Sequence, residues 1–232
     1  MKLLEVIAVN TADVRAANRY GADRIELVTG IAEGGLTPSL GLIEAAVAAS
    51  SIPVNVMIRP HSQSFVYGED DLGVMLRDIE SVRQAGAAGI VLGALTNEGS
   101  VDFAALEKLL SAAGTLDVTF HRAFDELADQ LEALKALAAY PQIRRVLTSG
   151  GLAPAPRALP RLRELNAASS AGTGPLILAG HGLTPETLES VLRETGVPEV
   201  HFGSAVREGG SFENPLSASR MRAVREILDS HD

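Results

Sequence analysis

Residues 24–39 read RIELVTGIAEGGLTPS, and this stretch contains a predicted strand and the connection that leads from it to a helix. The run RIELV is short and rich in β-branched and apolar residues, which predicts a strand. The two glycines allow the chain to turn, and Thr37-Pro38 has the composition of a helix N-cap and a first helical residue. Partial copies return as GLAP at 151–154 and GLTP at 182–185, so we expect helices to begin at all three loops.

Eight strand-like runs recur along the chain, with segments of helical spacing between them. The runs are LLEVIAV (3–9), RIELV (24–28), PVNVMI (53–58), AGIVLG (88–93), LDVTFH (116–121), RRVLT (144–148), PLILAG (175–180) and EVHFG (199–203). Strands that alternate with helices pair in parallel, and eight such units predict a single (β/α)8 TIM barrel over residues 1–232. An open doubly wound sheet is the alternative, but no linker or change in composition divides the chain.

The composition excludes several classes of protein and site. Lys and Arg number 20 against 29 Asp and Glu, and the net charge of −9 argues against nucleic acid or an anionic membrane as the main partner. Without cysteine, the chain has no disulfide, no Cys–zinc site and no thiol nucleophile. The N-terminal sequence lacks the apolar core of a signal peptide, and no apolar run is long enough for a membrane span. We therefore expect a cytoplasmic protein.

Alternation along the strands predicts which side chains point into the barrel. In PVNVMIRPH, the β-branched Val54, Val56 and Ile58 suit the side covered by helices, so Arg59 points inward. The same reasoning applied to four other runs directs acidic and imidazole side chains to the axis: Glu5, Glu26, His121 and His201. An unpaired charge there is costly, so these residues form either a paired network or a working site.

Four of the five histidines fall at or just past the end of a predicted strand: His61, His121, His181 and His201. Active sites of TIM barrels lie at this face, so we expect at least two of these histidines to function. Carboxylates and imidazoles suit divalent metal binding or acid–base chemistry. No lysine lies at a predicted strand end, which argues against a lysine-imine aldolase.

Glycines after the last two predicted strands indicate an anion site. Gly180 ends the seventh run and Gly182 follows it, while Gly203 ends the eighth run and Ser204 follows it. TIM barrels often hold a phosphate at this position through backbone N–H groups. Arg207 is near enough in sequence to assist.

Several longer motifs resemble the CutC family. They are GADRIELVTGIAEGGLTPSLG (21–41), PVNVMIRPHSQSFVYGEDDLGVMLRDI (53–79), VTFHRAFDE (118–126), RVLTSGG (145–151) and GHG (180–182). The resemblance implies a TIM barrel, a cytoplasmic location, a homodimer or larger homo-oligomer, and a role in copper binding and homeostasis. Family members often carry Cys on the first two strands, where this chain has Ile7 and Val28. A copper site that uses those thiols is therefore absent here.

The strand ends and the family motifs together give the candidate residues. As acid–base groups we predict Glu5, Glu26, His121 and His201. Binding of an anionic substrate is assigned to Arg59, Arg122, Ser149, Gly180, Gly182, Gly203 and Ser204. Metal ligands are predicted at His61, His121 and His201. Copper is the ion that the resemblance implies, and otherwise the site holds a divalent metal or none.

Three interpretations remain open. The first is a copper-homeostasis protein that binds metal. The second is a TIM-barrel enzyme with lyase- or isomerase-like chemistry on a small anionic or phosphorylated molecule. The third is that the inward charges pair only to fill the barrel. Under all three interpretations, we expect neither nucleic acid nor a membrane as a partner. The Ala- and Leu-rich helix expected at 125–139 is one surface that could pack against a second subunit.

Overall fold

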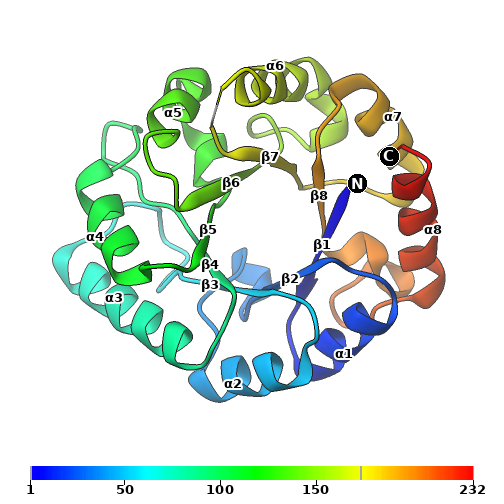
Figure 1. Ribbon diagram of the computed structural model, residues 1–232, viewed down its shortest axis with the longest axis horizontal. Coiled ribbons are helices and arrows are strands. Elements are labelled where there is room, and N and C mark those ends of the chain that lie inside the picture. Colours follow the sequence, from blue (N-terminus) through cyan, green and yellow to red (C-terminus); the bar gives the residue numbers. More distant parts are fainter. Residues whose placement is uncertain (1, 173, 232) are drawn as a thin grey trace.

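The computed structural model describes residues 2–172 and 174–231, and its centre is a closed barrel of parallel strands (Figure 1). The strands are β1 (Leu3–Ala8), β2 (Arg24–Leu27), β3 (Val54–Met57), β4 (Gly89–Leu92), β5 (Asp117–Phe120), β6 (Ile143–Thr148), β7 (Leu176–Ala179) and β8 (Glu199–Phe202). Each strand pairs in parallel with the next in chain order, and β8 returns to β1. The predicted (β/α)8 barrel is confirmed.

Eight α-helices form a ring outside the barrel (Figure 1), counted over the residues that the structure describes. They are α1 (Thr11–Arg19), α2 (Leu40–Ala49), α3 (Glu69–Gln84), α4 (Phe103–Ala113), α5 (Gln130–Leu137), α6 (Leu159–Ser170), α7 (Pro185–Thr195) and α8 (Ala218–Asp229). Short 3₁₀ turns lie at Ile31–Glu33, Arg122–Glu126, Ala155–Arg157, Ser204–Val206 and Glu208–Gly210. None of the helices in the described ranges is long and apolar enough to cross a membrane.

Alternation along the strands divides the core as predicted. Val54, Val56 and Ile58 join the large apolar layer between the barrel and the helices. Burial of each such side chain contributes about 1.5–3 kcal/mol. Inside the barrel the apolar cluster is small and consists of Ile7, Val28, Met57 and Val91. Leu147 and Leu178 are further buried apolar residues outside the large layer, and the charged residues of the site lie among these side chains.

The repeated glycine–leucine–proline phrase begins a helix at only one of its three places. Pro185 is the first residue of α7, and the Thr187 hydroxyl accepts the Thr184 N–H at 3.1 Å. α2 begins later than predicted, at Leu40, because Ser39 is its N-cap, and the Thr37 hydroxyl instead accepts the Arg59 N–H at 2.9 Å. The phrase at 151–154 leads into a 3₁₀ turn, and α6 follows at Leu159. A helix therefore follows the first copy directly, but the predicted Thr–Pro helix start was wrong there, and the second copy is followed by a 3₁₀ turn before its α-helix.

The helix expected at 125–139 is shorter in the structure. Asp129 caps α5 by accepting the Glu132 N–H at 3.0 Å, so the helix spans Gln130–Leu137. The residues before it form the 3₁₀ turn Arg122–Glu126, which brings Asp125 and Arg122 to the mouth of the barrel.

Candidate functional site

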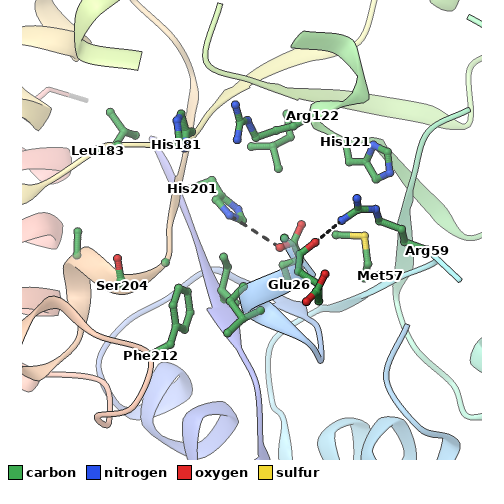
Figure 2. Close-up of a pocket in the computed structure, with 18 of the residues that line it drawn as sticks. Glu26, Met57, Arg59, His121, Arg122, His181, Leu183, His201, Ser204 and Phe212 are labelled. Atoms are coloured by element: carbon green, nitrogen blue, oxygen red, sulfur yellow. Dashed lines mark hydrogen bonds and ion pairs between the residues drawn. The ribbon is translucent and has the colours of Figure 1, made fainter. Parts of the chain in front are cut away.

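A cavity of about 480 Å³ opens at the carboxyl ends of the strands (Figure 2). Its walls come from the ends of several strands and the loops that follow them, as expected for a barrel of this type. Glu26 and His201 lie on one wall, and Arg59 and His121 lie on the other. The cavity therefore has an acid–imidazole wall and a guanidinium–imidazole wall.

On the first wall, His201 lies between two carboxylates. Its Nδ1 is 2.8 Å from Glu5 Oε1. Its Nε2 is 3.8 Å from Glu26 Oε2, a contact that Figure 2 shows. Glu5 is completely buried behind the cavity wall. An ionised carboxylate only accepts, so Nδ1 of His201 carries a proton, and Nε2 is the nitrogen that faces Glu26.

The pKa values of this trio are shifted by burial and by the neighbouring charges. Burial acts to raise the pKa of the Glu5 carboxyl, but Arg24 and the hydrogen bond to His201 outweigh it and hold the pKa far below its ordinary value. Burial raises the pKa of Glu26 to about 7, with His201 opposing the shift. Burial acts to lower the pKa of His201, but the charges of Glu26 and Glu5 raise it above its ordinary value. Near neutral pH, Glu26 is therefore only partly ionised, while Glu5 stays charged.

Below the cavity, a chain of alternating charges continues through the barrel. Arg24 binds Glu5 through Nε and binds Glu199 through Nη2 at 2.6 Å. Arg145 Nε in turn lies 3.0 Å from Glu199, and its Nη2 donates to Asp117 at 2.9 Å. Neither arginine was among the residues predicted to point into the barrel. The signal was present for Arg24, which has the same strand parity as Glu26, two residues away.

The second wall combines Arg59, His121 and Phe65. Arg59 is 8% exposed, and its Nη1 donates to the carbonyl oxygens of Glu33 at 2.9 Å and Gly35 at 3.2 Å. The Phe65 ring lies 4.8 Å from the guanidinium carbon and 4.8 Å from the His121 ring centre. Burial, with the nearby Arg59 charge, lowers the pKa of His121 to about 3, so His121 is neutral. No sequence signal marked Phe65, which reaches the cavity from the loop after β3.

The other predicted anion-binding residues divide into two groups. Arg122, Gly182, Gly203 and Ser204 line the cavity. Ser149 is fully buried and donates to Asp125 at 3.0 Å, and Gly180 packs against Leu147 and His201, so neither is among the lining residues. Asp125 also accepts Arg122 Nε at 2.8 Å, so Ser149 can act on the cavity only through this pair.

Two further predicted residues are turned away from the cavity. His61 Nε2 lies 3.5 Å from Asp71, and its ring packs on Tyr67. Arg207, expected to assist an anion, is instead buried against Asp13, which its Nη2 binds at 2.6 Å. This contact ties the loop after β8, which carries the lining residue Phe212, to the start of α1.

One cluster has the geometry of a metal site. Ligand atoms of Glu5, Glu26 and His201 all lie within 4.8 Å of one another, and no other group of three His, Cys, Asp or Glu does so in the described ranges. His61 and His121, predicted as ligands with His201, lie outside this cluster. The same three residues could also move protons, since His201 is oriented by Glu5 and faces Glu26.

Comparison with known proteins agrees with this architecture. The model of the CutC family matches residues 2–206. A CutC family protein of Glaesserella parasuis serovar 5 is 38% identical over 231 residues, which cover 99% of this chain and 93% of that protein. Another, from Salmonella paratyphi B, is 44% identical over 206 residues, covering 89% of this chain and 81% of that protein.

Solved structures extend the comparison to the fold. The putative copper homeostasis protein CutC from Streptococcus agalactiae superposes with a TM-score of 0.81 at 33% identity, covering 88% of this chain and 98% of that chain. Phosphoribosyl anthranilate isomerase from Thermococcus kodakaraensis, at a TM-score of 0.65 and 16% identity over 98% of this chain and 99% of that chain, shares the fold alone. The family match spans most of the barrel, and the chain belongs to the CutC family.

Proposed function

We propose that this CutC family member is a copper homeostasis protein that binds a divalent metal ion at the barrel mouth through Glu26 and His201. The observation that carries the proposal is the buried cluster of Glu5, Glu26 and His201. The proposal is also supported by the similar structure from Streptococcus agalactiae, which is named a putative copper homeostasis protein CutC.

The donor set suits a divalent ion better than copper(I). Imidazole and carboxylate groups bind Cu(II) and Zn(II), whereas Cu(I) prefers thiolate and thioether ligands, and this chain has no cysteine. Glu26 Oε1 is buried with no hydrogen-bond partner among the described residues, which leaves it available to a cation. His201 Nε2 faces the same space, while Glu5 binds Nδ1. A carboxylate behind a histidine in this way fixes the ring for metal binding.

A Cu(II) titration against a competing chelator tests the proposal. We expect micromolar or tighter binding by the wild type, and a loss greater than about 100-fold in Glu26→Gln and His201→Gln, since each removes a direct ligand. His61→Gln and His121→Gln are matched controls that also test whether those two predicted ligands contribute. Absence of micromolar binding by the wild type, or an equal loss in His61→Gln, would contradict the proposal.

A second candidate function is acid–base catalysis on a small anionic molecule. It is favoured by the orientation of His201, whose Nδ1 is fixed by Glu5 while Nε2 faces Glu26 and the cavity. In this case Glu26 and His201 transfer protons, while Arg59 and Arg122 bind the anion. A thermal-shift screen of phosphorylated and carboxylated metabolites tests it, because a ligand of the folded state raises stability. Failure of every compound to stabilise the wild type would count against this candidate.

We also propose, from the family resemblance, that the protein is a cytoplasmic homodimer or larger homo-oligomer. Light scattering coupled to size-exclusion chromatography measures the assembly directly, and a mass of one chain at micromolar concentration would refute it.

A further inference from the structure

Arg59 differs from every other buried arginine that the structure describes. Arg24, Arg145 and Arg207 each bind at least one carboxylate. Arg59 is also buried, with 8% of its surface exposed, but no carboxylate oxygen lies within 4.0 Å of it among the described residues. Glu33 reaches it only through its backbone carbonyl oxygen, since the Glu33 carboxylate accepts from the Ser62 hydroxyl at 2.6 Å. A desolvated cation without a counter-charge is unfavourable, and an anionic ligand would relieve this cost.

His121 adds an unused donor beside Arg59 (Figure 2). The Ala123 N–H donates to His121 Nδ1 at 3.2 Å, so the proton of the neutral ring lies on Nε2. Nε2 is buried and has no hydrogen-bond partner among the described residues. A buried N–H without an acceptor costs about 1–3 kcal/mol, which favours a ligand that offers an oxygen at this position.

The two groups are held rigidly in place. Phe65 packs against both the guanidinium and the imidazole. A Cβ at Gly93 would lie 2.7 Å from the His121 ring, and one at Gly34 would lie 3.1 Å from Arg59 Nη1, so the backbone closes around both side chains. Donors held in this way bind without further loss of side-chain entropy.

From these contacts we infer that Arg59 and His121 form an oxyanion-binding subsite, which takes the carboxylate or phosphate group of a small molecule. The inference rests on the proposed function only in placing the ligand in the same cavity. With its oxyanion on Arg59 and His121, the ligand would lie along the apolar Met57 and Phe212 and extend toward Glu26 and His201. The structure thus assigns the cavity a molecule with one anionic end.

Calorimetric titration with sodium phosphate and with sodium acetate tests the subsite, at constant ionic strength set by chloride. We expect saturable binding of at least one anion by the wild type, and an affinity at least about tenfold lower in Arg59→Gln. Arg83→Gln, an exposed arginine on α3, is the matched control and should bind as the wild type does. The ¹⁵N resonance of His121 Nε2 should shift as the anion binds, which reports contact independently of any effect on folding.

The outcomes distinguish a phosphate ligand from a carboxylate ligand. They also distinguish a failure of the oxyanion subsite from a failure of the proposed metal binding. Binding of phosphate alone indicates a phosphate monoester, binding of acetate alone indicates a carboxylate, and either result supports the subsite. Absence of saturable binding of both anions, or equal affinity in Arg59→Gln, overturns it. A parallel Cu(II) titration of Arg59→Gln should give the wild-type affinity, so loss of anion binding with metal binding intact is a failure of the subsite alone.

Discussion

Glu5 decides the chemistry available to the barrel mouth. This fully buried carboxylate accepts from Arg24 Nε and from His201 Nδ1. It keeps its charge because those two partners offset the cost of burial. By accepting a hydrogen bond from Nδ1 of His201, Glu5 directs the other ring nitrogen toward Glu26 and the cavity. A buried residue that lines no part of the cavity therefore sets what the cavity can bind.

Replacing Glu5 by Gln preserves its shape and removes its charge. We expect Glu5→Gln to lower the free energy of unfolding by about 3–5 kcal/mol, because Arg24 loses a buried counter-charge. Urea denaturation measures the change. Asp71→Asn, which alters a partly exposed carboxylate at the rim, is the control and should change stability by less than about 1 kcal/mol. Equal effects of the two substitutions would contradict the assigned role of Glu5.

The lowered pKa of His121 predicts how the stability of the folded protein changes as pH falls. Burial, with the charge of Arg59, lowers this pKa from 6.5 to about 3 in the folded protein. The unfolded chain therefore binds one more proton than the folded chain between these values, and stability falls as pH drops below 6.5. From pH 7 to pH 5.5 the wild type should lose about 1 kcal/mol more than His121→Gln. Denaturation curves at the two pH values check this, and parallel losses would show that His121 titrates normally.

For single residues, the sequence predicted which side chains point into the barrel better than it predicted which residues they bind. Glu5, Glu26, Arg59, His121 and His201 were placed inside the barrel from alternation alone, because alternation is a local property of a strand. The partners of those residues were not predicted. Arg24 on β2 meets Glu199 on β8 only because both strands pair with β1, and no single strand's sequence determines that register.

At the scale of elements, two glycines test how tightly the strands and helices are packed. A Cβ at Gly89, on β4, would lie 2.4 Å from the Asp117 carbonyl oxygen and 2.6 Å from Asn55 Oδ1. We expect Gly89→Ala to destabilise the protein by about 1–3 kcal/mol, since the backbone of β5 must move. Gly73 in α3 has no atom within 4 Å of such a Cβ, and Gly73→Ala should stabilise by about 0.5–1 kcal/mol. Thermal denaturation of both variants measures these changes. A Gly89→Ala protein as stable as the wild type would contradict the close packing of β4 on β5.

The elements also show where sequence patterns become ambiguous. Thr37-Pro38 and Thr184-Pro185 have the same composition, yet only the second pair starts a helix, because Ser39 caps α2 and Thr37 binds the backbone of Arg59. Phe65 and Phe212 could not have been assigned to the site. Both come from loops whose path depends on tertiary contacts, such as the pairing of Arg207 with Asp13.

At the scale of the whole molecule, alternating charges fill the barrel from its mouth toward its base. Glu199 lies between Arg24 and Arg145 and binds both. We expect Glu199→Gln to cost about 3–5 kcal/mol, because two buried guanidinium groups then lose a shared counter-charge. Glu164→Gln removes the exposed partner of Arg161 and should cost less than about 1 kcal/mol. Chemical denaturation of the pair measures the contrast, and similar small losses would mean that the interior network contributes little.

The interpretation that the inward charges pair only to fill the barrel holds for some of these residues. Arg24, Arg145 and Glu199 are fully engaged with one another and with Glu5 and Asp117. Glu26 and Arg59, at the mouth, are not engaged in this way, since Glu26 Oε1 and Arg59 Nε have no hydrogen-bond partner within the described chain. The interior is thus structural at its base and free to bind at its mouth.

The claim that Glu26 and His201 bind a divalent metal is tested most directly by anomalous diffraction from crystals grown with Cu(II). The account predicts an anomalous peak at the barrel mouth, bonded to a carboxylate oxygen of Glu26 and to Nε2 of His201, with Glu5 on Nδ1. Copper bound only elsewhere, for example at His61 or His231, with no peak between Glu26 and His201, would contradict it.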